Sequence, residues 1–242
     1  MLAGAERHVI EREFSSHVAE VVGRINDGKE ATVYRCRTTP AFGAADYLAA
    51  KMYRARKFRA FANESAYTNP GRMRDRRLAK AMKQRSRRGL DAAHHDWIDR
   101  EWAALTSLHE AGASVPTPHL HCPDGILMEY LGVDDVRAPS LAEARLSRDE
   151  AARALPLVLR DVEILLDCGL VHGDLSAYNV LYHEGRPRLI DLPQAMRIED
   201  APDGWSLFLR DVTNVCEHFS RRGVAVDGLD VAMDLWRRSG RR

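Results

Sequence analysis

Cysteine is scarce in this chain, and its four copies are scattered along the sequence. No two of them form a CxxC pair or stand at the spacing of zinc ligands, which argues against both a disulfide framework and a structural metal site. The N-terminus has no apolar signal core, and no apolar run approaches the length of a membrane span. We therefore expect a cytoplasmic protein in a reducing compartment, with no membrane partner.

Glycine is sparse where a phosphate-binding loop would be expected. Between residues 17 and 38 the only glycines are Gly23 and Gly28, so the G-x-G-x-x-G loop of ordinary protein kinases is absent. Two strands are nevertheless predicted, over residues 17–25 and 31–38, with a polar turn between them. A hairpin of this kind can lay backbone N–H groups over phosphates, and a plain hairpin turn explains the same pattern.

Charge is nearly balanced overall, at +1, but it is unevenly distributed. Residues 54–88 hold 13 lysines and arginines against two acids, Glu64 and Asp75. A stretch of this composition is either a solvated insertion or a contact surface for RNA, for a ribosomal particle or for another acidic partner. Composition alone favours neither interpretation.

A single lysine, Lys51, lies inside the apolar run of residues 47–53, which is predicted as a strand. Such a lysine either faces solvent on an edge strand or points into a cleft towards an anion. A helix predicted over residues 94–111 carries Glu101 within its apolar stripe. Because a buried glutamate needs a partner, Lys51 is the obvious candidate to pair with it.

Residues 170–195 form the stretch with the richest chemistry. Two short apolar runs, 180–182 and 188–192, are predicted as the strands of a hairpin with a turn over 183–187. Polar residues precede the first run and close the second. A hairpin so placed would bring these polar residues together at one end of the sheet.

Three of those residues match the needs of phosphoryl transfer. Asp174 could orient a nucleophile, while Asn179 and Asp191 could hold magnesium on the phosphates of a nucleotide. The spacing from Asp174 to Asn179 is that of the kinase signature H-R-D-x-x-x-x-N. Further along the chain, Arg210 and Asp211 form either a plain surface pair or a brace for the magnesium-binding loop, and we favour the surface pair.

A short apolar strand predicted over residues 125–132 ends in glycine, as a hinge between two lobes would. The backbone of Met128, Glu129 and Tyr130 could hydrogen-bond the edge of an adenine ring. A polar link follows at 133–140. Beyond it the periodicity predicts helices over 149–168, 205–221 and 226–238.

Together these motifs resemble the RIO family of atypical serine/threonine protein kinases. The family has Asp-Leu-Ser-x-Tyr-Asn and Ile-Asp-x-x-Gln where most protein kinases have other fillers and Asp-Phe-Gly. The resemblance spans roughly Val21 to Arg222. Its motifs are Gly28-Lys29-Glu30-Ala31-Thr32-Val33-Tyr34, the Lys51 strand, Trp97-Ile98-Asp99-Arg100-Glu101, the run from Leu170 to Asn179, and Ile190-Asp191-Leu192-Pro193-Gln194-Ala195.

The resemblance implies a role for each matching residue. Lys51 would contact the α- and β-phosphates of ATP, held in place by Glu101. Asp174 would be the catalytic carboxylate, and Asn179 with Asp191 would bind Mg²⁺ or Mn²⁺. Asp191 could instead accept the phosphoryl group as an aspartyl-phosphate. The remaining nucleotide contacts would come from Gly28, Lys29, Glu30, Ala31, Val33, Met128, Glu129 and Tyr130.

The implied fold is α+β and two-lobed like a protein kinase: an N-lobe of antiparallel sheet plus one helix, and a reduced, mainly helical C-lobe. We expect a short helix or a loose arm at 1–16, the N-lobe at 17–132 with its basic insertion at 54–88, and the C-lobe at 133–242. Little sequence precedes the first strand, so the chain is expected to be the short, bacterial type without the winged-helix domain of one branch.

Three functions are compatible with these residues. The first is a Mg-ATP-dependent serine/threonine protein kinase that phosphorylates itself and other proteins and could act as an ATPase switch. The second is a small-molecule phosphotransferase similar to aminoglycoside or choline kinases, which usually carry a His-Pro-Gly filler and a larger acidic C-terminal lobe. The third is a nucleotide-responsive assembly factor that binds RNA. The complete set of site residues favours an enzyme.

Overall fold

A computed structural model describes residues 2–43, 45–54 and 87–241 of the chain. The described residues fall into two compact units. Unit 1 comprises residues 1–102 and 117–130, and unit 2 comprises residues 103–116 and 131–242. The predicted RNA surface at 54–88 lies almost entirely outside the described residues. In the part of the chain that is described, no helix is both long and apolar enough to cross a membrane.

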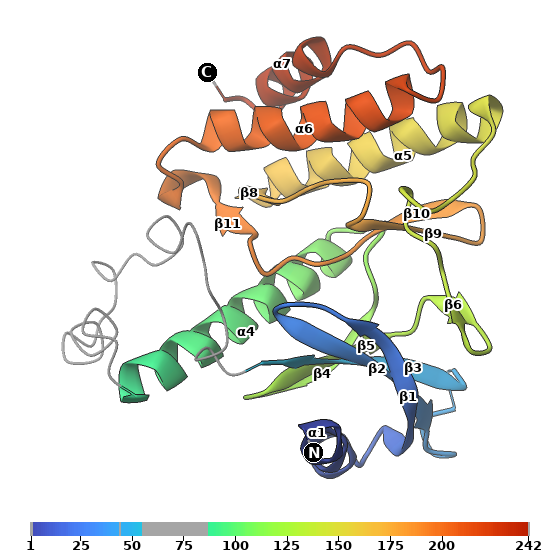
Figure 1. The fold of residues 1–242 in the computed structure, drawn as a ribbon. Coiled ribbons are helices and arrows are strands. Elements are labelled where there is room, and N and C mark those ends of the chain that lie inside the picture. Colours follow the sequence, from blue (N-terminus) through green and yellow to red (C-terminus); the bar gives the residue numbers. More distant parts are fainter. Residues whose placement is uncertain (1, 44, 55–86, 242) are drawn as a thin grey trace. The chain divides into compact units, whose positions relative to one another are not determined.

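Unit 1 is built on an antiparallel sheet with the strand order β1-β2-β3-β5-β4 (Figure 1). The predicted strand 47–53 is β3, and its position in the middle of the sheet excludes an exposed edge for Lys51. The hinge strand is shorter than expected and ends at Glu129, where its pairing with β3 ends. The bounds are β1 Val18–Asp27, β2 Ala31–Thr38, β3 Tyr47–Tyr53, β4 Pro118–Cys122 and β5 Gly125–Glu129.

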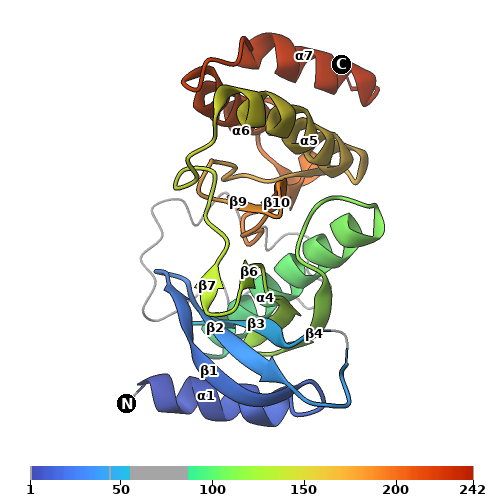
Figure 2. The same ribbon diagram turned by 90° about the vertical axis from the view of Figure 1, so that its right-hand side faces the viewer.

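The N-terminal residues form a helix, α1 (Leu2–Glu13), rather than a loose arm. It lies across one face of the sheet (Figure 2), where Ile10 and Phe14 are buried in the hydrophobic core of unit 1. The helix also covers the open edge of β1. Arg7 donates to the carbonyl oxygen of Val21 at 2.7 Å, and the amide of Val21 donates to Glu11 at 3.5 Å. These two contacts replace the ladder partners that an edge strand lacks.

Helix α4 (Arg87–Glu110) contains the predicted 94–111 helix and begins earlier. Its first part belongs to unit 1 and lies on the opposite face of the sheet from α1 (Figure 2). Ile98 is fully buried there, and Leu105 and Leu108 continue the apolar stripe into unit 2. The helix stops where Gly112 adopts a φ of 81°, a conformation that glycine takes without strain.

Unit 2 is mainly helical. Helices α5 (Arg148–Asp167) and α6 (Gly204–Ser220) lie side by side, and α7 (Gly228–Arg238) packs on α6 (Figures 1 and 2). Ser147 and Glu150 form a capping box at the start of α5, which fixes where that helix begins. The short elements are β6 Gly132–Val133, β7 Val136–Arg137, β8 Leu170–Val171, β11 Met196–Arg197 and η3 Ile198–Asp200.

The predicted hairpin in 170–195 is present as β9 (Val180–His183) and β10 (Arg186–Leu189). Its turn is tighter than the expected five residues. Only Glu184 and Gly185 connect the strands, with φ values of 50° and 76°. Positive φ at both positions is the geometry of a type I′ turn, whose twist matches that of the strands. The second strand consequently ends at Leu189, two residues before Asp191.

Candidate active site

The two charged residues that sequence analysis paired in unit 1 are in contact. The ammonium of Lys51 lies 2.7 Å from the Glu101 carboxylate. The other carboxylate oxygen accepts a hydrogen bond from the Tyr53 hydroxyl, and the Lys51 ammonium lies 5.3 Å from the centre of the Tyr53 ring. Lys51 and Glu101 are only 7% and 5% exposed. An ion pair this well buried survives because both charges are compensated.

The pleat of β3 explains why Lys51 reaches α4. Successive side chains of a strand point to opposite faces. Leu48, Ala50 and Met52 belong to the core cluster that also contains Ile10 of α1. Lys51 therefore points to the other face, where α4 supplies Glu101. Across the sheet, Lys51 is the registered partner of Val33 on β2, which places a second predicted nucleotide residue beside it.

The turn between β1 and β2 carries Gly28, Lys29, Glu30 and Ala31. It is closed by a 2.9 Å hydrogen bond from the Gly28 amide to the carbonyl of Ala31. A Cβ on Gly28 would lie 3.2 Å from that same carbonyl oxygen, so a larger residue would crowd the turn. Lys29 is exposed at the tip. The turn therefore presents a short backbone segment and one cation to solvent.

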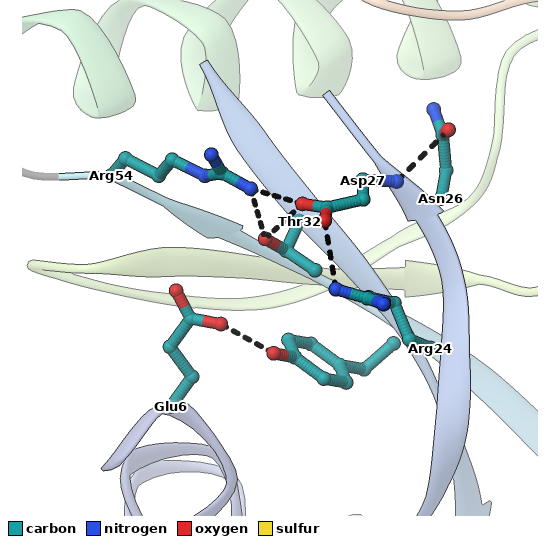
Figure 3. Close-up of polar contacts among 7 residues, drawn as sticks. Glu6, Arg24, Asn26, Asp27, Thr32 and Arg54 are labelled. Carbon is teal, nitrogen blue, oxygen red and sulfur yellow. Dashed lines mark hydrogen bonds and ion pairs between the residues drawn. The ribbon is translucent and has the colours of Figure 1, made fainter. Parts of the chain in front are cut away.

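A polar cluster holds the base of this turn, as Figure 3 shows. Asp27 accepts hydrogen bonds from Arg54, from Arg24 at 2.7 Å and from the Thr32 hydroxyl at 3.3 Å. The backbone amide of Arg54 also donates to the carbonyl of Glu30 at 2.9 Å. One carboxylate thus ties together the ends of β1, β2 and β3, and this cluster fixes the position from which the turn projects.

The expected adenine contacts lie at the end of β5. Met128 pairs with Ala49 of β3, so its place in the sheet is fixed. The Glu129 carboxylate accepts hydrogen bonds from the amide and the hydroxyl of Thr117, at 2.9 and 3.1 Å. The Tyr130 ring packs edge-on against Tyr47, with 6.2 Å between ring centres. The side chains of this segment hold its shape, and its part in nucleotide binding stays a prediction.

In unit 2, Asp174 and Asn179 are brought together on one loop. The Asn179 amide nitrogen lies 2.8 Å from the carbonyl oxygen of Asp174 and 3.4 Å from its carboxylate. The backbone carbonyl of Asn179 accepts from the amide of Ile190 at 2.9 Å. Ile190, the residue directly before Asp191, is therefore held against Asn179. Asp191 itself adopts a left-handed φ of 64°, an uncommon conformation for a residue other than glycine.

The donors of this loop suit a hard divalent cation. The nitrogen of the Asn179 amide is engaged with Asp174, so its oxygen is the atom left to face a ligand. Asp191 adds a carboxylate. Among residues 2–43, 45–54 and 87–241, no three His, Cys, Asp or Glu side chains gather in a metal-binding cluster. One amide and one carboxylate nevertheless fit magnesium, which is commonly held by one or two carboxylates together with water and substrate phosphates.

Asp211 on α6 is the functional residue that sequence reasoning misjudged. Arg210 does lie 3.8 Å from its carboxylate, but Asp211 is only 3% exposed, so the expected position of the pair on the surface is wrong for Asp211. Its carboxylate accepts from the amides of Gly173 at 2.8 Å and Leu175 at 3.1 Å. Burial raises the pKa of Asp211, against the opposing effects of His172 and these two amides. The residue braces the loop that carries Asp174.

Two further side chains of α6 hold the same loop. Arg210 donates to the carbonyl of Gly173, and Asn214 donates to the carbonyl of Leu175 at 3.2 Å. The sequence contains a signal for this arrangement. Asp211 lies within the apolar stripe of α6, on the face that it shares with Phe208, Val212, Val215 and Phe219. A carboxylate on an apolar helix face must find donors inside the protein.

The residues before Asp174 are fixed as well. His172 is 2% exposed, and its Nε2 lies 3.2 Å from the carbonyl oxygen of Ile190. Gly173 has a φ of 80°, and a Cβ at this position would lie 2.6 Å from the carbonyl oxygen of Gln194. Only glycine fits there without displacing the chain beyond Asp191. His172 and Gly173 therefore allow the loop that carries Asp174 to pack closely against the segment around Asp191.

Comparison with known proteins identifies the family. The sequence profile described as "RIO domain" matches residues 32–231. The chain is 34% identical over 205 residues to serine/threonine-protein kinase RIO1 of Caenorhabditis elegans, covering 84% of this chain and 38% of the relative. It is 32% identical over 213 residues to RIO-type serine/threonine-protein kinase Rio1 of Haloferax volcanii, covering 88% and 67%. With serine/threonine-protein kinase RIO1 of Homo sapiens the identity is 30% over 210 residues, covering 86% and 35%.

The match extends through most of the chain but not through most of the larger relatives. The chain spans well under half the length of the worm and human proteins. The profile match includes every site residue described above, apart from those that precede residue 32. On the extent of the profile match and the identity to these relatives, this chain belongs to the RIO family.

Proposed function

We propose that the chain is a Mg-ATP-dependent serine/threonine protein kinase of RIO type. The observation that carries the proposal is the buried pair of Lys51 and Glu101, in a chain that also holds Asp174 and Asn179 together. In protein kinases a lysine on the third strand is held by a helix glutamate in this way, and the pair must be in place for phosphoryl transfer. The names of the relatives, all serine/threonine-protein kinases, support the same reaction.

Each residue has a distinct task in the proposed reaction. Lys51 contacts the α- and β-phosphates, and Glu101 keeps its ammonium oriented. Asp174 accepts a hydrogen bond from the serine or threonine hydroxyl of the substrate. It receives the proton as the hydroxyl oxygen bonds to the γ-phosphorus, while the bond from that phosphorus to the β,γ-bridging oxygen breaks and ADP leaves. The brace from Asp211 fixes the backbone on both sides of Asp174 and so limits the positions that this carboxylate can take.

Asn179 and Asp191 hold the divalent cation in this proposal, with Mg²⁺ preferred and Mn²⁺ accepted. A cation held by these two residues would supply neutralisation of the charge that develops on the phosphates. The turn at Gly28, Lys29, Glu30 and Ala31 covers the phosphates, with Val33 beside Lys51. The strand end at Met128, Glu129 and Tyr130 receives the adenine.

Location and partners complete the proposal. The four cysteines are free, and Cys36, Cys122 and Cys216 are buried, which supports a reducing, cytoplasmic setting. The protein substrates include the chain itself. Contact with RNA or a ribosomal particle through residues 54–88 rests on the basic composition of that stretch.

The test follows the γ-phosphate of labelled ATP. With magnesium present, we expect acid-stable label on serine or threonine. Asp174→Asn should lower the transfer rate by a factor on the order of 100 to 10,000, since it removes the proton acceptor, and leave ATP affinity within about twofold. Asp167→Asn, the same change at an exposed position on α5, is the matched control.

Two results would contradict this assignment. Loss of ATP binding together with transfer in Asp174→Asn would show that the residue serves the nucleotide rather than the acceptor. Label that is labile to base and hydroxylamine, and that disappears in Asp191→Asn, would identify an aspartyl-phosphate ATPase instead of a protein kinase. Absence of label and of hydrolysis with ATP still bound would favour a small-molecule phosphotransferase or an assembly factor.

A further inference from the structure

Tyr178 occupies an unusual position on the loop that carries the proposed catalytic carboxylate. It is 72% exposed, more than any other large apolar or aromatic side chain among the described residues. The apolar residues on either side of it are buried, since Leu175 is 1% and Val180 is 0% exposed. A tyrosine usually gains free energy by burying its ring, so a ring kept in solvent next to a reaction site calls for a partner.

The loop beneath Tyr178 is anchored and cannot easily fold the ring away. Asp211 accepts from the amides of Gly173 and Leu175, as described above. The carbonyl of Ala177 accepts from the amide of Ala142 at 3.1 Å. The amide of Tyr178 itself lies 3.3 Å from the Ser176 hydroxyl oxygen. The backbone of this loop is thus held at Gly173, Leu175 and Ala177.

The side chain of Tyr178 has no role in holding unit 2 together. Within residues 2–43, 45–54 and 87–241, its ring makes no aromatic contact and its hydroxyl makes no hydrogen bond. Truncating it would leave no cavity, because so little of it is buried. What remains is its location, four residues after Asp174 and one before Asn179.

We propose that Tyr178 is a specificity-determining residue that packs against the acceptor segment of the protein substrate. The inference rests on the proposed kinase function and names its substrate more closely: a serine-containing segment with an apolar or aromatic side chain near the serine. The ring supplies a flat apolar surface to that side chain, and the hydroxyl can hydrogen-bond the peptide backbone. A single-stranded RNA base and the nucleotide itself are the competing occupants, and the test separates them.

The experiment uses the full chain with Mg-ATP and a serine-peptide library in which one position beside the serine is fixed at a time. The wild type should favour apolar and aromatic residues at one such position. Tyr178→Ala should abolish that preference and raise KM for the favoured peptide about tenfold, the loss of one good aromatic contact. kcat and the KM for ATP should stay within about twofold, and Tyr178→Phe should retain the preference.

Leu229→Ala, which truncates another exposed side chain on α7, is the control and should match the wild type. The inference is overturned if Tyr178→Ala keeps both the preference and the peptide KM. It is also overturned if the variant raises KM for ATP instead, if only an oligonucleotide loses affinity, or if the wild type labels itself but no peptide. Absence of any transfer by the wild type would contradict the proposed kinase function itself, and this outcome is distinguishable from failure of the Tyr178 inference.

Discussion

The two units position their chemical groups in different ways. In unit 1, Lys51 and Glu101 hold each other, so one side chain orients another. In unit 2, Asp211 holds the backbone of the Asp174 loop through the amides of Gly173 and Leu175. Asp174 itself stays exposed on that loop. The first arrangement is a charge pair that can be removed as a pair. The second is a carboxylate whose partners are main-chain amides, which only a substitution by proline could remove.

In unit 1, stability can be restored without restoring the proposed function. In unit 2, the same contacts support both. A buried ion pair replaced by apolar residues of similar volume often leaves stability unchanged or improved. A buried amide that loses its acceptor keeps its desolvation cost, whatever replaces the acceptor. A single substitution should therefore lower stability in either unit. A second substitution should restore stability in unit 1 but not in unit 2.

The largest effect is expected for Asp211→Ala. It leaves two buried amides without an acceptor, which should lower the free energy of unfolding by about 4 kcal/mol at roughly 2 kcal/mol each. The phosphoryl-transfer rate should fall by at least about 100-fold, because Asp174 is no longer held in place. Urea titration and the labelled-ATP assay measure the two effects. A loss of unfolding free energy below about 1 kcal/mol, with a normal transfer rate, would show that Asp211 does not brace the loop. Asp167→Ala, at an exposed position, is the control.

Lys51→Met should cost slightly less, about 3 kcal/mol, since the buried carboxylate of Glu101 loses the ammonium that compensates its charge. ATP affinity should fall as well. The informative variant is the double substitution Lys51→Met with Glu101→Leu. It should regain most of the lost stability and none of the ATP affinity, which urea titration and calorimetric titration with ATP can measure. Full recovery of ATP binding would show that Lys51 does not contact the nucleotide.

The smallest effect concerns pH and His218 of unit 2. Burial, reinforced by Arg222 and Arg221, lowers the pKa of His218 to about 4, and Arg222 lies 3.2 Å from its Nδ1. The unfolded chain binds the proton more readily, so stability present above about pH 6.5 is lost as pH falls towards 4. By pH 5, about 1.5 units below the unfolded pKa, the loss should be roughly 2 kcal/mol at 1.36 kcal/mol per unit, and His218→Gln should abolish it.

In unit 1, burial chiefly raises the pKa of Tyr34, Cys36 and Cys122, and such groups weaken the fold only at alkaline pH. In unit 2, burial also raises the pKa of Asp161 and Asp211, which works in the opposite direction to His218. The difference between wild type and His218→Gln isolates the histidine, and parallel stability curves between pH 7 and 4 would refute its role.

Sequence reasoning found the parts of the site that depend on local pattern. Lys51 and Glu101 stand out because each interrupts an apolar run at a regular period, and pairing them is the simplest way to compensate both charges. The β9–β10 hairpin was predictable for the same reason. The strand bounds were less so, because the ladder between β3 and β5, rather than the run of apolar residues, decides that β5 ends at Glu129.

What sequence reasoning missed depends on contacts between distant segments. The brace from Asp211 joins residues 36 and 38 positions apart, and a neighbouring arginine made a local surface pair the simpler interpretation. The left-handed φ of Asp191 is likewise invisible in a pattern of apolar residues. The sequence pattern does not separate a helix from a loose arm at the N-terminus, because half of the residues of α1 are charged or histidine, and the packing of Ile10 and Phe14 on the sheet decides the matter.

Gly173 has a consequence for how this sequence can change over evolution. Its missing Cβ makes room for the carbonyl of Gln194. The residue type at position 173 and the path of the chain after Asp191 therefore depend on each other. An arginine at 173, as in the signature of ordinary protein kinases, cannot be acquired by one substitution unless the chain around Gln194 moves as well. A change from His-Gly-Asp to the His-Arg-Asp of ordinary protein kinases therefore requires paired changes in two loops.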